Sequence, residues 1–270
     1  MTFDVASAQA LDYAPCRYGT SKLVFRGPRV TLNKPYIAVL GGTETYGKCV
    51  ADPFADLLSD LLGRTCVNLG CLNAGIDAFV QDADIVQIVG NAQVTVLQVL
   101  GAHNLSSRFY KVHPRRNDRF VAPTPLLRSV YRNVDFTQFH FTKHMLTVLR
   151  EICPHRFAAI RSELQKAWLS RMRQLIGKAD GPVVLLWLRH HRKSPLGAEP
   201  HFVTRDMVNQ LKPRLAGVLE LPVCAAGPAG ESQEMLFGPF EAPLAADLLG
   251  PATHREIART LSKQLRQIGL

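Results

Sequence analysis

Apolar and polar residues alternate along the chain with two periods, which predict strands and helices in turn. Short apolar runs bounded by glycine, proline or polar residues indicate strands buried on both faces of a sheet; these runs lie at 36–40, 65–69, 94–100, 183–188 and 222–226. Helical spacing predicts helices at 54–62, 76–81, 136–151, 155–176, 204–215 and 254–265. Strand, helix, strand, helix, strand is the order of right-handed βαβ units. We therefore expect an α/β protein, with three α/β/α layers around a mostly parallel, flavodoxin-like sheet of about five strands.

Length and composition agree with this fold class. The chain has 270 residues, of which 47% are hydrophobic, enough to bury one full core. We expect an N-terminal extension over residues 1–34, with a hairpin around Gly27-Pro28, and a single α/β domain over residues 35–270. A mostly helical insertion at about 105–180 would cover the sheet as a cap.

The sequence also predicts a cytoplasmic protein. No apolar run reaches the roughly 20 residues of a membrane-spanning helix. The first fifteen residues lack the basic-then-apolar pattern of a secretory signal. Six cysteines without C-x-x-C spacing fit reduced thiols better than a zinc ribbon or a disulfide framework. The oligomeric state is left open.

A glycine-bounded turn, residues 41–47, follows the first strand, where an α/β sheet usually holds its ligand. One interpretation is a Walker A loop over residues 42–49, but Cys49 stands where that motif needs a hydroxyl for magnesium. Pro53 would also fall inside the helix that such a loop begins. Asp52-Pro53 instead predicts the start of the next helix and Gly63 its end, so nucleotide binding is disfavoured.

The same turn, G-G-T-E-T-Y-G, resembles block I of the SGNH (GDSL-like) hydrolases, G-D-S-x-T-x-G. The resemblance implies that Thr43 is the nucleophile. Residues 68–75 resemble block II, where a glycine N–H contributes to the oxyanion hole; Gly70 is the first candidate and Gly75 the second. Residues 101–104, G-A-H-N, stand where the family has G-x-N-D. If the two motifs align residue by residue, His103 is the third donor of the oxyanion hole; if they are shifted by one residue, the third donor is Asn104.

A final segment, residues 249–261, resembles the D-x-x-H that precedes the last helix of these hydrolases, so His254 falls at the catalytic base. Pro251 occupies the aspartate position, which leaves Asp247 or a backbone carbonyl to orient the imidazole. The resemblance implies a hydrolase or acyltransferase that acts on an ester, such as an O-acylated carbohydrate, without cofactor or metal. The alternatives are a catalytically impaired domain that binds an anionic saccharide, and a sulfotransferase-like transferase. The chain is also similar to an uncharacterised bacterial family of this length.

Basic residues suggest an anionic partner. The net charge is +10, but it is spread along the chain without a nucleic-acid-binding motif, so nucleic acid is disfavoured. Arg108, Arg115 and Arg116 follow the third block and are candidate substrate-binding residues, with a solvated basic loop as the alternative. A second basic cluster, residues 189–193, also follows a strand. Its side chains either reach the site or lie in an exposed loop. His140 and His144 share a helical face, but the glutamate of H-E-x-x-H is absent.

Overall fold

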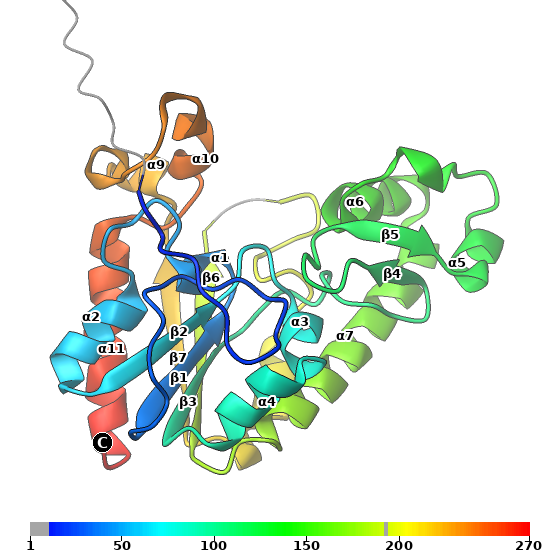
Figure 1. Ribbon diagram of the computed structural model, residues 1–270. Coiled ribbons are helices and arrows are strands. Elements are labelled where there is room, and N and C mark those ends of the chain that lie inside the picture. Colours follow the sequence, from blue (N-terminus) through cyan, green and yellow to red (C-terminus); the bar gives the residue numbers. More distant parts are fainter. Residues whose placement is uncertain (1–10, 192–193) are drawn as a thin grey trace, which may run out of the picture.

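The central element is a sheet of five parallel strands in the order β2-β1-β3-β6-β7. A computed structural model describes residues 11–191 and 194–270 (Figure 1). The strands are β1 (Tyr36–Gly41), β2 (Thr65–Gly70), β3 (Val94–Gln98), β6 (Val183–His190) and β7 (Gly217–Val223). β1 lies between β2 and β3, with Gly41 opposite Gly70. The predicted α/β class and parallel sheet are confirmed.

Helices cover both faces of this sheet (Figure 1). Ile37 and Val39 of β1 pack with α2 (Phe54–Leu62) and α11 (Pro251–Gln267). Ala38 and Leu40 belong to the core on the other face, with α3 (Ile76–Val80), α4 (Ala83–Gly90), α7 (Pro154–Ile176) and α8 (Arg205–Asn209). Successive residues of a strand point to opposite faces of the sheet. Since helices cover both faces, the residues on both sides of β1 must be apolar, which explains its unbroken apolar run. The three-layer arrangement is confirmed.

The segment between β3 and β6, where a mostly helical insertion is expected, contains a hairpin as well as helices. It begins with an antiparallel hairpin of β4 (Tyr110–Val112) and β5 (Phe120–Pro123), whose strands are too short to give a period-two signal. α5 (Pro125–Val130) follows, and then α6 (Thr142–Ile152) packs beside α7. The helix expected over 136–151 begins only at Thr142, because Phe136–Gln138 form a 3₁₀ turn that the Asp135 side chain caps.

Residues 11–34 of the expected extension form an arm that packs on the domain instead of a hairpin. Cys16 and Phe25 make a single antiparallel bridge. The buried Arg26 guanidinium donates hydrogen bonds to the carbonyls of Gly47, Val50 and Ala51. Since these carbonyls lie at the last residue of the turn after β1 and just beyond it, the arm helps to fix the predicted active-site turn. Residues 1–10 of the expected extension lie outside the described residues.

Two boundaries near the end of the chain differ from the prediction. The helix expected over 204–215 is α8 followed by a 3₁₀ turn, Lys212–Arg214, which contains Pro213. The last strand ends at Val223 rather than spanning 222–226, because β7 is a half-buried edge strand in which Glu220 interrupts the apolar run. Between β7 and α11 lie α9 (Ala226–Ala229), α10 (Ala242–Ala246) and the 3₁₀ turns Ser232–Glu234 and Pro239–Glu241.

Candidate active site

The turn after β1 is held by a buried amide from the neighbouring strand. Gln98, the last residue of β3, accepts hydrogen bonds on Oε1 from Gly42 N (2.9 Å) and Thr45 Oγ1 (2.7 Å). Its Nε2 donates to Glu44 Oε2 at 2.8 Å. A Cβ on Gly41 would collide with both Thr45 Oγ1 and Gln98 Oε1, so only glycine fits there. One carboxamide therefore fixes the short helix α1 (Thr43–Tyr46) and the Glu44 carboxylate.

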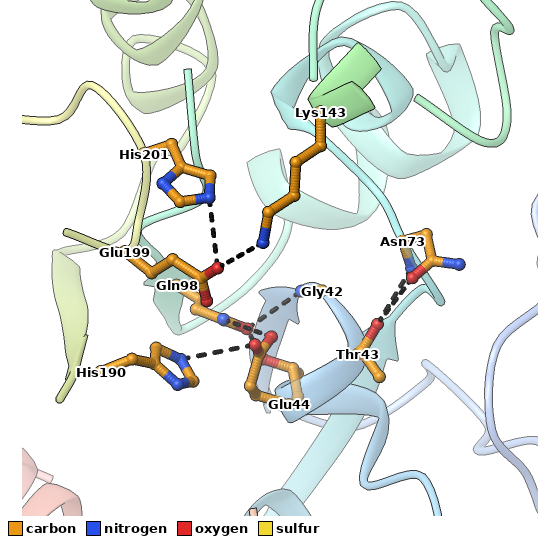
Figure 2. A network of polar contacts seen from close by, with 10 residues as sticks. Gly42, Thr43, Glu44, Asn73, Gln98, Lys143, His190, Glu199 and His201 are labelled. Atoms are coloured by element: carbon orange, nitrogen blue, oxygen red, sulfur yellow. Dashed lines mark hydrogen bonds and ion pairs between the residues drawn. The ribbon is translucent and has the colours of Figure 1, made fainter. Parts of the chain in front are cut away.

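A small cavity of about 180 Å³, which we call the chamber, opens at this edge of the sheet. Thr43 and Glu44 line it from α1, and His190 lines it from the end of β6. His190 Nε2 lies 3.6 Å from Glu44 Oε1 (Figure 2). A carboxylate beside an imidazole is the arrangement that orients a general base. The chamber is thus a polar site beyond the carboxyl ends of β1, β3 and β6.

The opposite wall of the chamber joins the cap to the loop after β6. Lys143 of α6 donates to Glu199 Oε1 at 3.0 Å, and His201 Nε2 lies 3.2 Å from the same oxygen (Figure 2). These two contacts hold the pKa of Glu199 well below its usual range, although burial opposes the shift. His103 packs edge-on against His201, with 4.9 Å between ring centroids. Burial is the main cause that lowers the pKa of His103 to about 3, so its ring is neutral.

The hydroxyl of Thr43 is engaged by Asn73 rather than by a base. Asn73 N donates to Thr43 Oγ1 at 3.1 Å, and Oγ1 lies 3.4 Å from Asn73 Oδ1, which can accept its proton (Figure 2). Asn73 adopts a left-handed backbone, with φ of 56°. The threonine therefore lies in the chamber wall in a resting orientation, and attack on a substrate would need its hydroxyl to leave Asn73.

The predicted oxyanion donors separate into two groups. The N–H of Gly70 donates to Asn68 Oδ1 at 2.9 Å, and that of Gly75 donates to Asn117 Oδ1 at 2.9 Å. Neither N–H is therefore free to bind an oxyanion. His103 and Asn104 both line the chamber. Asn104 Oδ1 accepts a hydrogen bond from Thr142 at 2.6 Å, an orientation that leaves the amide nitrogen as the available donor.

The predicted base, His254, lies elsewhere. Its Nδ1 accepts a hydrogen bond from Phe54 N at 3.0 Å, where α2 begins, and its ring stacks on Phe54. Pro53 is the N-cap residue of α2 and has no side-chain acceptor, so His254 supplies one from α11. Burial lowers the pKa of His254 to about 3, and its side chain lines neither cavity that Thr43 lines. The structure therefore gives His254 a helix-capping role and does not bring it to the chamber.

The predicted arginines are also divided. Arg115 and Arg116 line a larger groove of about 920 Å³ that reaches Thr43 and Glu44, whereas Arg108 lines neither this groove nor the chamber. In the 189–193 cluster, His190 reaches the chamber, whereas Arg189 pairs with Glu220 at 3.0 Å. Arg192 and Lys193 lie outside the described residues.

Two features bear on the other interpretations of the sequence. The helix after β1 ends at Tyr46, and Lys48 pairs with Glu241 at 3.3 Å, so no helix begins at a Gly-Lys step as in a nucleotide-binding loop. Within residues 11–191 and 194–270, no group of three His, Cys, Asp or Glu residues could hold a metal ion. No helix in this part of the chain is long and apolar enough to cross a membrane.

Several chamber residues were not singled out from the sequence: Gln98, Lys143, Glu199 and His201. Gln98 carried a usable signal, because it is the one amide in the apolar run 94–100 and a buried polar group needs a partner. Glu199 and His201 lie in an irregular loop after β6, and Lys143 comes from the cap. No local pattern predicts that these residues meet.

Comparison with known proteins identifies the family. The model described as "Domain of unknown function (DUF6473)" matches residues 1–269, so the chain belongs to that family. No curated protein and no solved structure matches the chain.

Proposed function

We propose that the protein is an SGNH-like hydrolase or acyltransferase that acts on an ester in the chamber. The observation that carries the proposal is the convergence of Thr43, Glu44 and His190 on one small cavity at the carboxyl edge of the sheet. Nucleophilic catalysis requires a hydroxyl, a base and a group that orients the base. In this proposal Glu44 and His190 take the role that the family resemblance gave to His254.

The chemical step follows from these residue types. His190 removes the proton of the Thr43 hydroxyl as Thr43 Oγ1 bonds to the ester carbonyl carbon. The tetrahedral intermediate then collapses and breaks the bond to the alcohol oxygen, which takes the proton from His190. Water, or a second alcohol in a transferase, releases the acyl group from Thr43. Glu44 stabilises the imidazolium that forms, and its contact with Gln98 keeps it in place.

Oxyanion stabilisation in this proposal comes from side chains. Neutral His103 and the amide nitrogen of Asn104 are the donors on the chamber wall. A single such donor contributes about 3 kcal/mol to lowering the barrier. The engaged N–H groups of Gly70 and Gly75 support this choice of side chains over glycines.

Binding without turnover is the second candidate. It is favoured by one observation, the hydrogen bonds that hold the Thr43 hydroxyl on Asn73. If these bonds persist when a ligand is bound, Thr43 does not attack, and the chamber serves recognition only.

Hydrolysis of activated short-chain esters and acetylated sugars separates the two candidates. We expect the wild type to turn over at least one ester, and Thr43→Ala and His190→Gln each to lower kcat by at least about 10³-fold. Thr43→Ser should retain activity, since it keeps the hydroxyl. Thr260→Ala and His155→Gln, on α11 and α7 away from the chamber, are the matched controls. Activity that survives both Thr43→Ala and His190→Gln would refute the proposed catalytic groups.

A further inference from the structure

A groove of about 920 Å³ lies beside the chamber and shares Thr43, Glu44 and Asn73 with it. Its volume is within the range of small-molecule sites, and it is several times larger than the chamber. We call it the basic groove because five cationic side chains line it: Lys22, Lys48, Arg115, Arg116 and Arg119. They come from the N-terminal arm, the loop after α1 and the β4–β5 loop, so the fold gathers charge from three distant segments.

The cations of the basic groove are only partly neutralised. Lys48 pairs with Glu241 at 3.3 Å, and Arg116 is 3.9 Å from Asp118, near the limit for an ion pair. Arg119 lies over the ring of Phe141. Within the described part of the chain, the side chains of Lys22 and Arg115 form no hydrogen bond or ion pair. Glu44 and Asp247 are the two carboxylates in the lining, so positive charge dominates the groove.

The turn that carries Arg115 and Arg116 is built from a fully buried amide. Asn117 Oδ1 accepts from Gly75 N (2.9 Å) and Ala78 N (3.1 Å), at the start of α3. Its Nδ2 donates to His113 O at 3.0 Å, which ties the β4–β5 loop to the turn after β2. The loop is therefore anchored beside the site, unlike a loop whose charges are merely solvated.

A histidine inside the same turn orients the two arginines. The backbone N–H groups of Arg115 and Arg116 both donate to His113 Nδ1, at 3.3 and 3.2 Å. This arrangement fixes the backbone of adjacent arginines, both of which line the groove. Two guanidinium groups that line one groove suit the oxygen atoms of a carboxylate, sulfate or phosphate.

We propose that the basic groove binds an oxyanion group of an elongated substrate, whose ester extends into the chamber. The inference rests on the proposed function for the role of the chamber, and it adds the chemical class of the substrate: an anionic small molecule or short acidic saccharide. Arg115 and Arg116 bind the oxyanion, and Lys22 and Lys48 add positive charge to the lining. The apolar lining residues Leu23, Val24 and Leu72 contact the uncharged part of the substrate.

Isothermal titration with a heparin-derived tetrasaccharide, inorganic sulfate and inorganic phosphate tests the groove without any requirement for turnover. We expect the double variant Arg115→Ala/Arg116→Ala to weaken tetrasaccharide binding at least about tenfold, because each charge-assisted hydrogen bond contributes that much or more. The double variant Arg161→Ala/Arg259→Ala removes the same charge from exposed positions on α7 and α11 and should bind within about twofold of the wild type. Comparison of the three ligands shows which oxyanion the arginines prefer.

Two outcomes would refute the proposal that the basic groove binds an oxyanion. The first is that the wild type binds none of the three ligands at low ionic strength. The second is that both double variants weaken binding equally, because a general attraction to the protein's charge would not depend on which arginines are removed. The titrations measure affinity and not turnover, so they separate this inference from the proposed function. Tetrasaccharide binding that Arg115→Ala/Arg116→Ala weakens and Arg161→Ala/Arg259→Ala leaves unchanged supports the groove even if no ester is hydrolysed.

Discussion

Replacement of His254 gives the sharpest test of its helix-capping role. His254→Ala removes a ring that is 1% exposed and leaves Phe54 N without an acceptor. Loss of the packed ring costs about 2–4 kcal/mol, and an unpaired buried N–H costs about 1–3 kcal/mol. We therefore expect the free energy of unfolding to fall by about 4 kcal/mol. Urea denaturation at pH 7.5, followed by circular dichroism, measures the loss.

The variant His254→Asn separates capping from catalysis. An asparagine Oδ1 can replace the histidine Nδ1 as the acceptor for Phe54 N, so His254→Asn should recover part of the stability that His254→Ala loses. It cannot act as a base. If His254→Ala unfolds at the same urea concentration as the wild type, the capping role is refuted. Equal losses in the two variants would show that the hydrogen bond contributes nothing.

The pH dependence of stability follows from the same contact. The pKa of His254 is lowered to about 3 in the folded chain, whereas an unfolded histidine titrates near 6.5. The unfolded state therefore binds more protons below pH 6.5, and stability falls as the pH falls through that window. This proton binding lowers the free energy of unfolding at pH 5 by about 2 kcal/mol relative to pH 7.5. Between pH 7.5 and pH 5, the free energy of unfolding of His254→Asn should therefore fall by about 2 kcal/mol less than that of the wild type. An equal fall in both proteins would contradict a neutral, buried His254.

Three further substitutions test how the active-site turns are held, each by urea denaturation. Asn117→Ala should cost about 1–3 kcal/mol, because it leaves Gly75 N–H unpaired and Ala78 N–H with only its 3.3 Å bond to Gly75 O, whereas Asn117→Asp keeps the oxygen that accepts from both and should lose less. Gly47→Ala should destabilise more than Gly63→Ala: both have positive φ, but a Cβ at Gly47 collides with Pro53 and one at Gly63 meets open space. Arg26→Met should cost about 3 kcal/mol, since the carbonyls of Val50 and Ala51 lose a donor and that of Gly47 keeps only Val50 N–H.

Each of these expectations has a clear contrary result. Equal losses in Asn117→Ala and Asn117→Asp would show that the acceptor bonds do not stabilise the loop. Equal losses at Gly47 and Gly63 would show that the close approach to Pro53 is relieved at little cost. An Arg26→Met protein as stable as the wild type would mean that the arm does not fix the turn after β1.

The sheet was predictable because its signal is local. Both faces of β1, β2, β3 and β6 are almost fully buried, so their residues are mostly apolar; Asn68 in β2 and Thr95 in β3 are the polar residues inside these runs. β7 lies at the edge of the sheet, where Glu220 is tolerated, and its position was therefore misjudged. The β4–β5 hairpin was missed because three or four residues do not establish a period.

The sequence indicates some residues of the candidate site but not the contacts between them. The turn after β1 and the pair Arg115-Arg116 are visible in the sequence as glycine spacing and charge density, and the structure places them around one groove. The partners of Glu44 were harder, since Gln98 and His190 come from two other strands and meet it only in the folded sheet. His254 shows the opposite case: its position at the start of the final helix matches a catalytic pattern, but its place in space depends on where α11 packs against α2.

Covalent labelling tests the central claim, that Thr43 and His190 form one reactive site, most directly. An alkyl fluorophosphonate reacts with an activated hydroxyl, which forms an oxygen–phosphorus bond and releases fluoride, and peptide mass spectrometry then locates the adduct. We predict an adduct on Thr43 in the wild type and in folded His254→Asn, and none in His190→Gln. An adduct on another residue, or labelling of Thr43 that is unchanged in His190→Gln and lost in folded His254→Asn, would contradict the account.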